Sequence, residues 1–215
     1  MPLLAERADG LSPAFLALLA EEDFAGLSIL DVGTGRGRLA TVLAPRCRRV
    51  VGVDLDPLAI DQARRGAAGV ANVEFVVADA ETTEYAAFAP DAIVAHLCMS
   101  DAIIERASRA LGLGRVFTFA AFHADQWRET GRRSRFAYDE AQARTVLEAA
   151  GFAVEHLSVE REVREFGSVE EGLAAAVALE EKWKADGRWF HYIQFLEDGG
   201  RTLTRSHLHV KARRR

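Results

Sequence analysis

The chain has 215 residues and a mass of 23.5 kDa, enough for one α/β domain that buries a core without disulfides or a structural metal. Its 49% hydrophobic and 27% charged residues match globular averages and exclude disordered and fibrous classes. A net charge of −5 with an isoelectric point of about 5.7 disfavours a protein that coats nucleic acid.

Neither a membrane span nor a metal pattern is visible in the sequence. The longest apolar stretches fall far short of the ~20 residues that a span requires. The N-terminus, MPLLAERADG, has no basic region of the kind that opens a secretory signal. Cys47 and Cys98 are too few for a disulfide framework, and their spacing matches no zinc site. We therefore expect a cytoplasmic protein with no membrane attachment and no metal.

The first half of the chain alternates short β-rich runs with helical stretches. We expect residues 1–10 to be a loose lead-in, and Ser12-Pro13 to begin a helix over AFLALLAEEDF. Strands alternating with helices at this spacing predict a parallel sheet with helices on both faces. The predicted strands are 27–32, 49–54, 73–77, 92–97 and 115–122. The predicted helices are 38–44, 57–65 (capped by Asp56) and 101–111.

This alternation changes after His123. Residues 124–138 form a polar, arginine-rich connection that is long for such a domain. Asp139 and Gln142 form a capping-box pattern, which predicts a helix ending at Gly151. A strand over about 152–159 follows.

A second capping box, Ser168 with Glu171, predicts a helix to about Ala185. Another helix over 189–197 and a last strand over 201–210 complete the chain. The sequence contains no internal repeat, linker or low-complexity segment. We therefore predict a single domain, 1–215.

The segment ILDVGTGRG, residues 29–37, lies where the first strand ends and a helix begins. Open α/β sheets bind ligands at this place, because glycines permit close backbone approach and the helix N-terminus favours a carboxylate or phosphate. The spacing is G-x-G-x-G and not the G-x-G-x-x-G of dinucleotide binders. Asp31 would stand close to a pyrophosphate, so it favours a cationic, amine-bearing ligand over NAD.

Two more acids follow the next two predicted strands. Asp54 can accept the two hydroxyls of a ribose; its alternative role is to cap the following helix, which we assign to Asp56. Asp79 is placed to accept from an exocyclic amine, and its alternative role is that of a turn residue. Three acids at the ends of three consecutive strands, beside a glycine turn, predict a binding site.

Taken together, these motifs resemble the class I S-adenosylmethionine-dependent methyltransferases. ILDVGTGRG is similar to their first motif, VVGVDLDP to their acidic second-strand motif and FVVADAE to their adenine-contacting third-strand motif. APDAIVAHL and LGLGRVFTF are similar to their fourth and fifth strands. The resemblance is close over residues 27–122 and extends further only through the order of elements. Gly112-Leu-Gly114 departs from the common Pro-Gly-Gly turn, which lies remote from the cofactor.

The resemblance implies a three-layer α/β sandwich with a seven-stranded, mostly parallel sheet of order 3-2-1-4-5-7-6 and an antiparallel last strand. Residues 27–122 would form the cofactor-binding half and 123–215 the substrate-side half. A helical cap over about 167–200 would be inserted before the last strand. The Gly167–Gly200 segment is long enough to roof a pocket.

The resemblance also implies S-adenosylmethionine as cofactor and S-adenosylhomocysteine as its product. Asp31 would help hold the amine of the methionine moiety, Asp54 the ribose hydroxyls, and Asp79 with the Ala80 amide the adenine edge. Leu55 would lie against the adenine. The predicted cofactor-binding residues are Asp31, Gly33, Thr34, Gly35, Gly37, Asp54, Leu55, Asp79, Ala80, Ala95 and His96.

The implied reaction is methyl transfer by direct in-line displacement. Because the methyl is already activated, positioning and exclusion of water can supply most of the catalysis. The acidic net charge favours a small-molecule acceptor. One alternative is a nucleic-acid (RNA) methyltransferase, although HLCMSD replaces the Asn/Asp-Pro-Pro-Tyr motif of base-flipping enzymes. Another is a subunit that binds S-adenosylmethionine without catalysis. The oligomeric state is left open.

Candidate acceptor-side residues follow the fourth and fifth strands and lie in the cap. His123 is the predicted catalytic residue, as a general base, or alternatively a strand-end histidine without chemistry. Cys98 is alternatively a small buried apolar residue. The aromatic residues of the 167–200 segment either line a cavity or pack the cap onto the rest of the protein. The arginines of the 124–138 connection either bind a carboxylate or phosphate or are only solvated. His207 and His209 share a strand face, a signal too weak for a metal site. The predicted substrate residues are Cys98, Ser100, Trp127, Arg132, Trp189 and Tyr192.

Overall fold

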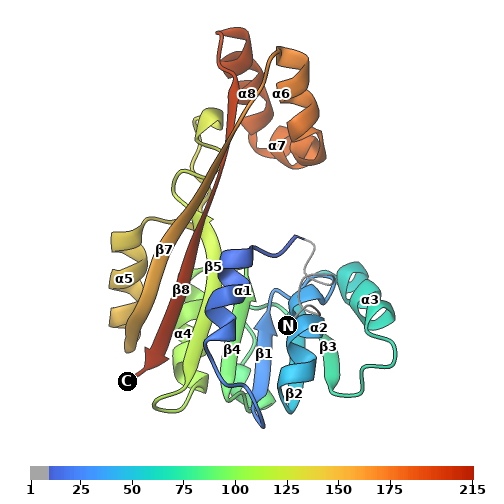
Figure 1. The fold of residues 1–215 in the computed structure, drawn as a ribbon, viewed down its shortest axis with the longest axis vertical. Helices are drawn as coiled ribbons and strands as arrows, with labels where there is room; N and C mark the ends of the chain where they lie inside the picture. Colours follow the sequence, from blue (N-terminus) through green and yellow to red (C-terminus); the bar gives the residue numbers. More distant parts are fainter. Residues whose placement is uncertain (1–9) are drawn as a thin grey trace. The chain divides into compact units, whose positions relative to one another are not determined.

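The computed structural model describes residues 10–215, which form a mixed sheet surrounded by helices (Figure 1). The sheet has the order β3-β2-β1-β4-β5-β8-β7, with β6 paired to β5. The strands are β1 Ser28–Val32, β2 Arg49–Asp54, β3 Val73–Val77, β4 Ala92–His96, β5 Val116–His123, β6 Ala137–Tyr138, β7 Phe152–Glu165 and β8 Thr202–Arg214.

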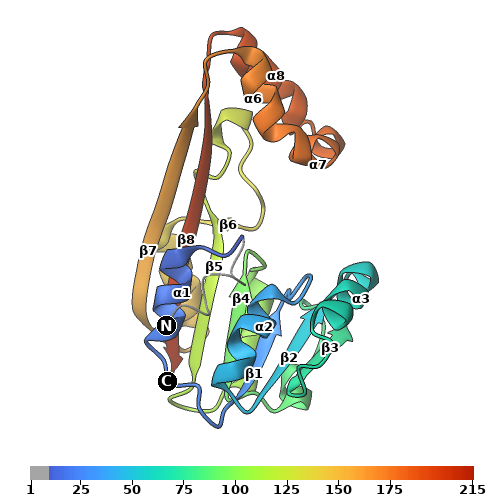
Figure 2. The ribbon, with the colours of Figure 1, turned by 45° about the vertical axis from the view of Figure 1, so that its right-hand side comes forward.

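The pairs among β1 to β5 are parallel, and Figure 2 shows β8 running opposite to β7. Since β6 is two residues long, β7 and β8 are the sixth and seventh main strands. The predicted α/β class and the order 3-2-1-4-5-7-6 are therefore confirmed, with β6 as an addition. Both β7 and β8 are longer than predicted, because their charged ends, EREVRE and KARR, continue in extended conformation.

Figure 1 shows α1 and α2 in front of the sheet and α4 behind it. The helices are α1 Pro13–Ala20, α2 Arg38–Leu43, α3 Pro57–Gly66, α4 Asp101–Ala110, α5 Glu140–Ala149, α6 Val169–Ala176, α7 Glu180–Asp186 and α8 Arg188–Glu197. Short 3₁₀ helices are η1 Ala44–Arg46, η2 Tyr85–Phe88, η3 Arg128–Thr130 and η4 Val177–Leu179. No helix among the described residues is long and apolar enough to cross a bilayer.

Side-chain caps begin the helices where the sequence predicts them. Ser12 accepts from Phe15 N–H at 3.3 Å at the start of α1. Ser168 accepts from Glu171 N–H at 3.2 Å, and the Glu171 carboxylate accepts from Gly167 N–H at 2.8 Å, which completes the capping box of α6. These starts are fixed by neighbouring residues, which is why the sequence predicts them well.

The chain divides into two compact units. The first comprises the residues up to Ala121, Glu140–Ser158 and His209–Arg215, and the second comprises Phe122–Asp139 and Val159–Leu208. The predicted single domain with halves 27–122 and 123–215 stays a prediction. Of the predicted lead-in over residues 1–10, all but Gly10 lies outside the described residues.

The core of the first unit lies between its central strands and the helices that flank them. Every residue of β1 is buried, and Asp31 within it is aligned with Gly52 of β2 and Val94 of β4. A strand paired on both sides exposes no edge, so its apolar residues are buried on both faces. The core cluster includes Phe15, Leu19, Phe24, Ile29, Leu39, Leu43, Val50, Ile60, Phe75, Val94 and Val116. This packing fixes the ends of β1, β2 and β4, where the candidate site lies.

The second unit has its own apolar cluster, built from α6, α7, α8 and the segments around them. Its members include Trp127, Phe166, Ala176, Trp183, Trp189, Tyr192, Leu196 and Leu203. The single helix predicted from Ser168 to about Ala185 is wrong, because η4 separates α6 from α7. The sequence from Ala176 to Glu180 contains neither proline nor glycine, so no local signal marks the break.

Candidate functional site

The glycine loop between β1 and α2 lies in the first unit. Gly33, Gly35 and Gly37 have φ angles of +69°, +54° and +76°, a region that L side chains rarely adopt. A Cβ on Gly33 would lie 2.2 Å from Cys98 Cβ, and one on Gly37 would lie 2.5 Å from Phe75 Cζ. At Gly35, no described atom beyond its chain neighbours lies within 4 Å of that position. Gly33 and Gly37 therefore allow close packing of the loop, and Gly35 borders open space.

Asp31 is a buried carboxylate, and only one of its two oxygens accepts hydrogen bonds from the described residues. Oδ2 accepts from Thr34 Oγ1 at 2.6 Å and from Ala40 N–H at 3.1 Å. Oδ1 is buried and has no hydrogen-bond partner among the described residues. Burial raises the pKa of Asp31 to about 7, because the ionised carboxylate loses its hydration. A ligand ammonium group would satisfy Oδ1.

A cavity of about 250 Å³ opens beside Asp31. The glycine loop, Arg36 and Arg38 at the start of α2, and His96 and Leu97 at the end of β4 line it. Arg36 and Arg38 are not among the predicted site residues, and their places on either side of Gly37 are the one sequence signal for them. A lining that carries a carboxylate and two guanidinium groups suits a zwitterion such as an amino acid.

Asp54 connects the glycine loop to the end of β2. Its Oδ2 accepts from Gly35 N–H at 2.8 Å and its Oδ1 from Asp56 N–H at 2.9 Å. The helix cap is Asp56, which accepts from Leu58 N–H at 2.8 Å, as predicted. Each Asp54 oxygen keeps a further lone pair for a ligand hydroxyl. The side chain of Leu55, predicted to lie against adenine, is 67% exposed.

Asp79 forms a turn directly after β3. Its Oδ1 accepts from Glu81 N–H at 2.8 Å, and its main-chain oxygen accepts from Thr83 N–H at 2.9 Å. The turn interpretation of Asp79 is therefore confirmed. Its Oδ2 has no partner among the described residues, so the turn leaves one oxygen for a ligand.

Cys98 shows that these acids gather at one edge of the sheet. Burial and, after it, the negative charges of Asp54, Asp31, Glu81 and Asp79 raise the pKa of the Cys98 thiol to about 12. The thiol therefore stays protonated at neutral pH and is not a nucleophile. The same charges create a negative potential that favours a cationic ligand.

The end of β4 turns sharply toward α4. Ala95 is buried, and Leu97 has φ +57° while its N–H donates to Ala120 O at 2.7 Å. A non-glycine residue in this region is strained, a feature often found at functional sites. Ser100, a predicted substrate residue, caps α4 by accepting from Ile103 N–H at 3.4 Å. Substrate contact by Ser100 and Cys98 stays a prediction.

In the second unit, His123 is buried and held through Nδ1. Asp125 N–H donates to Nδ1 at 3.2 Å, and Ser206 Oγ lies 2.9 Å from the same atom. Since an amide N–H can only donate, Nδ1 carries the lone pair and the neutral ring carries its proton on Nε2. The role of His123 in catalysis stays a prediction.

The aromatic residues of the second unit pack on one another. Ring centroids are 5.3 Å apart for Trp127 and Trp183 and 5.5 Å apart for Trp183 and Tyr192, both edge to face. Trp127, Trp189 and Tyr192 are all at most 8% exposed. The aromatic residues therefore pack against one another, which was the alternative to lining a cavity. Their contact with substrate stays a prediction.

The arginines of the long connection contact their own unit. Arg132 donates to the main-chain oxygen of Asp186, and Arg133 pairs with Asp139 at 3.7 Å. Arg135 lies over the ring of Phe136, 4.2 Å from its centroid. All three arginines are exposed, which agrees with the solvated-loop alternative, and binding of an anionic acceptor by Arg132 stays a prediction.

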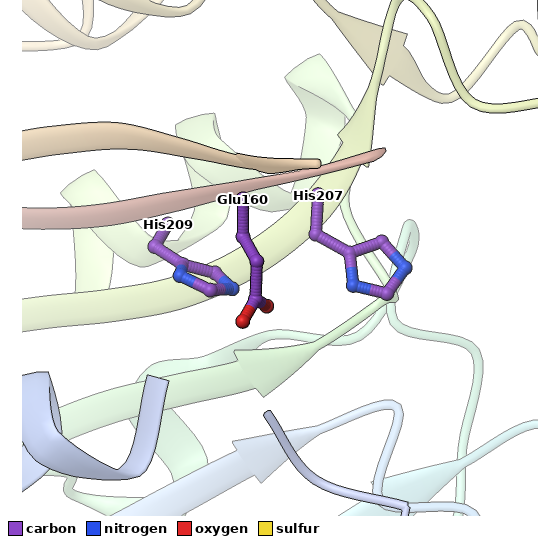
Figure 3. A group of neighbouring side chains, drawn as sticks. All are labelled: Glu160, His207 and His209. Carbon is purple, nitrogen blue, oxygen red and sulfur yellow. The ribbon is translucent and has the colours of Figure 1, made fainter. Parts of the chain in front are cut away.

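His207 and His209 project from the same face of β8, as the sequence predicts (Figure 3). Within the second unit, His207 neighbours Glu160 of β7, with ligand atoms within 4.8 Å of each other. His209 belongs to the first unit, where its ring packs on Phe15.

Glu129 is a buried carboxylate of the second unit that accepts three hydrogen bonds. Its oxygens accept from Thr204 N–H at 3.0 Å, Thr204 Oγ1 at 2.5 Å and Thr202 Oγ1 at 3.2 Å, and its side chain is 2% exposed. We expect Glu129→Ala to lower the free energy of unfolding by about 3 kcal/mol, because it leaves buried donors unpaired. Urea denaturation measures this loss, with the exposed Glu181→Ala as control. A loss below about 0.5 kcal/mol would show that Glu129 does not stabilise the unit.

A second cavity, of about 500 Å³, is lined by residues at the amino ends of β1, β2 and β3. Its guanidinium groups are already paired, Arg48 with Asp91 at 3.5 Å and Arg49 with Glu74 at 2.6 Å. None of the predicted site residues lines it. The smaller cavity beside Asp31 is therefore the candidate site.

Comparison with known proteins bears on this site. A sequence model described as a methyltransferase domain matches residues 29–114. An uncharacterized protein of Methanocaldococcus jannaschii is 34% identical over 79 residues, which is 36% of this chain and 30% of that protein. The match thus spans about a third of that relative's length.

Solved structures share the fold across most of the chain. The YcgJ protein of Bacillus subtilis has a TM-score of 0.71 at 16% identity, covering 95% of this chain and 99% of that one. An S-adenosylmethionine-dependent methyltransferase of Mesorhizobium loti has a TM-score of 0.62 at 21% identity, covering 96% and 100%. Magnesium protoporphyrin IX methyltransferase of Synechocystis, with bound S-adenosylhomocysteine, has a TM-score of 0.61 at 16% identity, covering 94% and 80%.

The matched segment begins in β1 and ends just before β5, so it contains the glycine loop, Asp31, Asp54 and Asp79. The strand order around it is the one that the motifs imply. Residues 29–114 thus match a methyltransferase domain in sequence, and the chain shares its fold with solved S-adenosylmethionine-dependent methyltransferases.

Proposed function

We propose that this protein transfers the methyl group of S-adenosylmethionine to a small-molecule acceptor by direct in-line displacement. The observation that carries the proposal is the buried, unpartnered Oδ1 of Asp31 beside the cavity of the glycine loop. A buried carboxylate oxygen without a donor is costly, and a ligand ammonium group removes that cost. The matching methyltransferase domain supports the same ligand.

The residues present fit this cofactor. Asp31 would take the ammonium group of the methionine moiety, Asp54 the ribose hydroxyls, and Asp79 with Ala80 N–H the adenine edge. The open space at Gly35 admits a ligand close to the backbone. When bound, S-adenosylmethionine supplies a methyl group already activated by its sulfonium.

The protein's own contribution to the reaction would be positioning and exclusion of water. We assign acceptor selection to residues 123–215, which include the helices of the 167–200 segment. The net charge of −5 supports a small-molecule acceptor over a nucleic acid, and the similar Synechocystis enzyme is named for such an acceptor.

Transfer of labelled methyl from S-adenosylmethionine into fractionated metabolite pools tests the proposal. We expect label in a small-molecule fraction, and no label when an excess of S-adenosylhomocysteine is present. Label only in RNA would favour the nucleic-acid alternative. Binding of the cofactor without label in any fraction would favour a non-catalytic subunit.

Asp54→Ala is expected to weaken S-adenosylhomocysteine binding about 30-fold, because it removes a charged acceptor for two hydroxyls. It also removes the acceptor of Gly35 N–H, so part of the loss comes from the loop. Asp56→Ala is the control: it costs about 1 kcal/mol of stability as a lost cap and leaves affinity unchanged. Calorimetric titration measures the affinity of both variants for S-adenosylhomocysteine. Full affinity in Asp54→Ala would show that Asp54 does not bind the ligand.

A further inference from the structure

Arg106 of α4 binds the loop that follows β3. Its Nε donates to Glu81 O at 2.5 Å, and its Nη1 donates to Thr83 O at 3.2 Å and to Glu84 Oε1 at 2.7 Å. The Arg106 side chain is only 19% exposed, and its bonds to the two main-chain carbonyls are part-buried, whereas the Glu84 carboxylate is exposed. A planar guanidinium can hold several acceptors in a fixed geometry, which a lysine ammonium cannot do.

The same loop is held by a second side chain and by its own turn. Tyr85 is buried, and its hydroxyl donates to Ala80 O at 2.6 Å. Asp79 Oδ1 accepts from Glu81 N–H, and Asp79 O accepts from Thr83 N–H. The carbonyls of Ala80, Glu81 and Thr83 are therefore all engaged with the protein. Asp79 Oδ2 and Ala80 N–H keep no partner among the described residues.

This remaining pair has the polarity of one edge of adenine. Asp79 Oδ2 accepts, as the exocyclic amine requires, and Ala80 N–H donates, as the ring nitrogen next to that amine requires. A base with oxygen in place of the amine reverses both requirements, so the pair would reject it. Such discrimination needs the two groups held in fixed register, because a mobile loop would adapt to either base.

Resting on the proposed function, we propose that Arg106 is a positioning residue that holds Asp79 and Ala80 in the register for adenine. Arg106 would act through the loop, because its guanidinium donates to Glu81, Thr83 and Glu84. Arg106 fixes the carbonyls of Glu81 and Thr83, which lie one and three residues after Ala80. Tyr85 fixes the carbonyl of Ala80 itself.

The test compares S-adenosylhomocysteine with its deaminated form, S-inosylhomocysteine, by calorimetric titration. The wild type is expected to prefer the adenine form by about 30-fold or more. Arg106→Ala should lose about tenfold in affinity for the adenine form, with the preference reduced to a few-fold. Arg106→Lys should lie between, because an ammonium cannot hold all three acceptors at once. Arg109→Ala is the matched control, since this exposed arginine on the same helix pairs with Glu105.

An unchanged preference in folded Arg106→Ala would overturn the inference, and so would a wild type without preference. If Arg106→Ala does not fold, Arg106→Lys and Tyr85→Phe are compared instead. Each of these variants keeps most of the side-chain packing and loses hydrogen bonds to the loop after β3. A reduced preference in both supports the inference, and an unchanged preference in both overturns it. A wild type that binds neither compound would instead refute the proposed function.

Discussion

Affinity of the wild-type protein for S-adenosylhomocysteine is expected to rise about tenfold between pH 6 and pH 8. Burial raises the pKa of Asp31 to about 7, and only the ionised carboxylate attracts the ligand ammonium group. At pH 6 most of the protein must first lose a proton at Asp31, whereas at pH 8 the carboxylate is already charged. Calorimetric titration across this range, in buffers of matched ionic strength, measures the effect.

Asp31→Asn should make this profile flat and lower the affinity at pH 8 by about 10- to 100-fold, since a charged hydrogen bond is lost. Stability should change in the opposite sense. The folded pKa of Asp31 lies above its unfolded value, so its contribution is present below about pH 4 and is lost as pH rises through about 7. Wild-type stability should therefore fall relative to Asp31→Asn over that range. Parallel pH profiles of the two proteins would contradict this role of Asp31.

Gly37→Ala is expected to lower the free energy of unfolding by about 3 kcal/mol, because the added methyl group brings both backbone strain and steric overlap. The φ of +76° strains any L side chain. In addition, the new Cβ would lie 2.5 Å from the Phe75 ring and 3.0 Å from Ala63 Cβ. Both neighbours are at most 5% exposed, so neither can move into solvent. Chemical denaturation measures the loss.

Substitutions at Gly26 and Gly35 distinguish the cost of backbone strain from the cost of steric overlap. Gly26→Ala has φ +73° and no described atom near its Cβ, so it should cost only about 1 kcal/mol. Gly35→Ala should cost a similar amount of stability and also weaken cofactor binding, because its methyl group enters open space at the site. Equal losses at Gly26 and Gly37 would show that backbone strain, and not the contact with Phe75, decides the cost.

Most of the fold follows from local sequence signals. β2 and β3 have the predicted bounds, and Ser12, Asp56 and Ser168 cap the predicted helices. Each of these depends on residues within a few positions of one another. The extra lengths of β7 and β8 depend instead on partners far along the chain, such as Arg213 with Glu155 at 2.6 Å. Such distant pairs leave no periodic signal in the sequence, so charged strand ends resemble loops.

The candidate site was predictable only in part, for a similar reason. Asp31, Asp54 and Asp79 end consecutive parallel strands, so topology alone brings them to one edge. The sequence does not show that Asp31 leaves Oδ1 unpaired or that Arg106 reaches the loop after β3 from α4. It also leaves open whether the aromatic residues of the second unit line a pocket, whereas the structure places Trp183 and Tyr192 in an apolar core.

Titration of the wild-type protein with S-adenosylhomocysteine at pH 8 tests the central claim most directly. We predict saturable binding of one ligand per chain with a Kd of about 10 μM or tighter. NADH at the same concentrations should give no binding heat, because the glycine spacing and Asp31 disfavour a pyrophosphate. No binding of S-adenosylhomocysteine up to about 1 mM, or equal binding of NADH, would contradict the account.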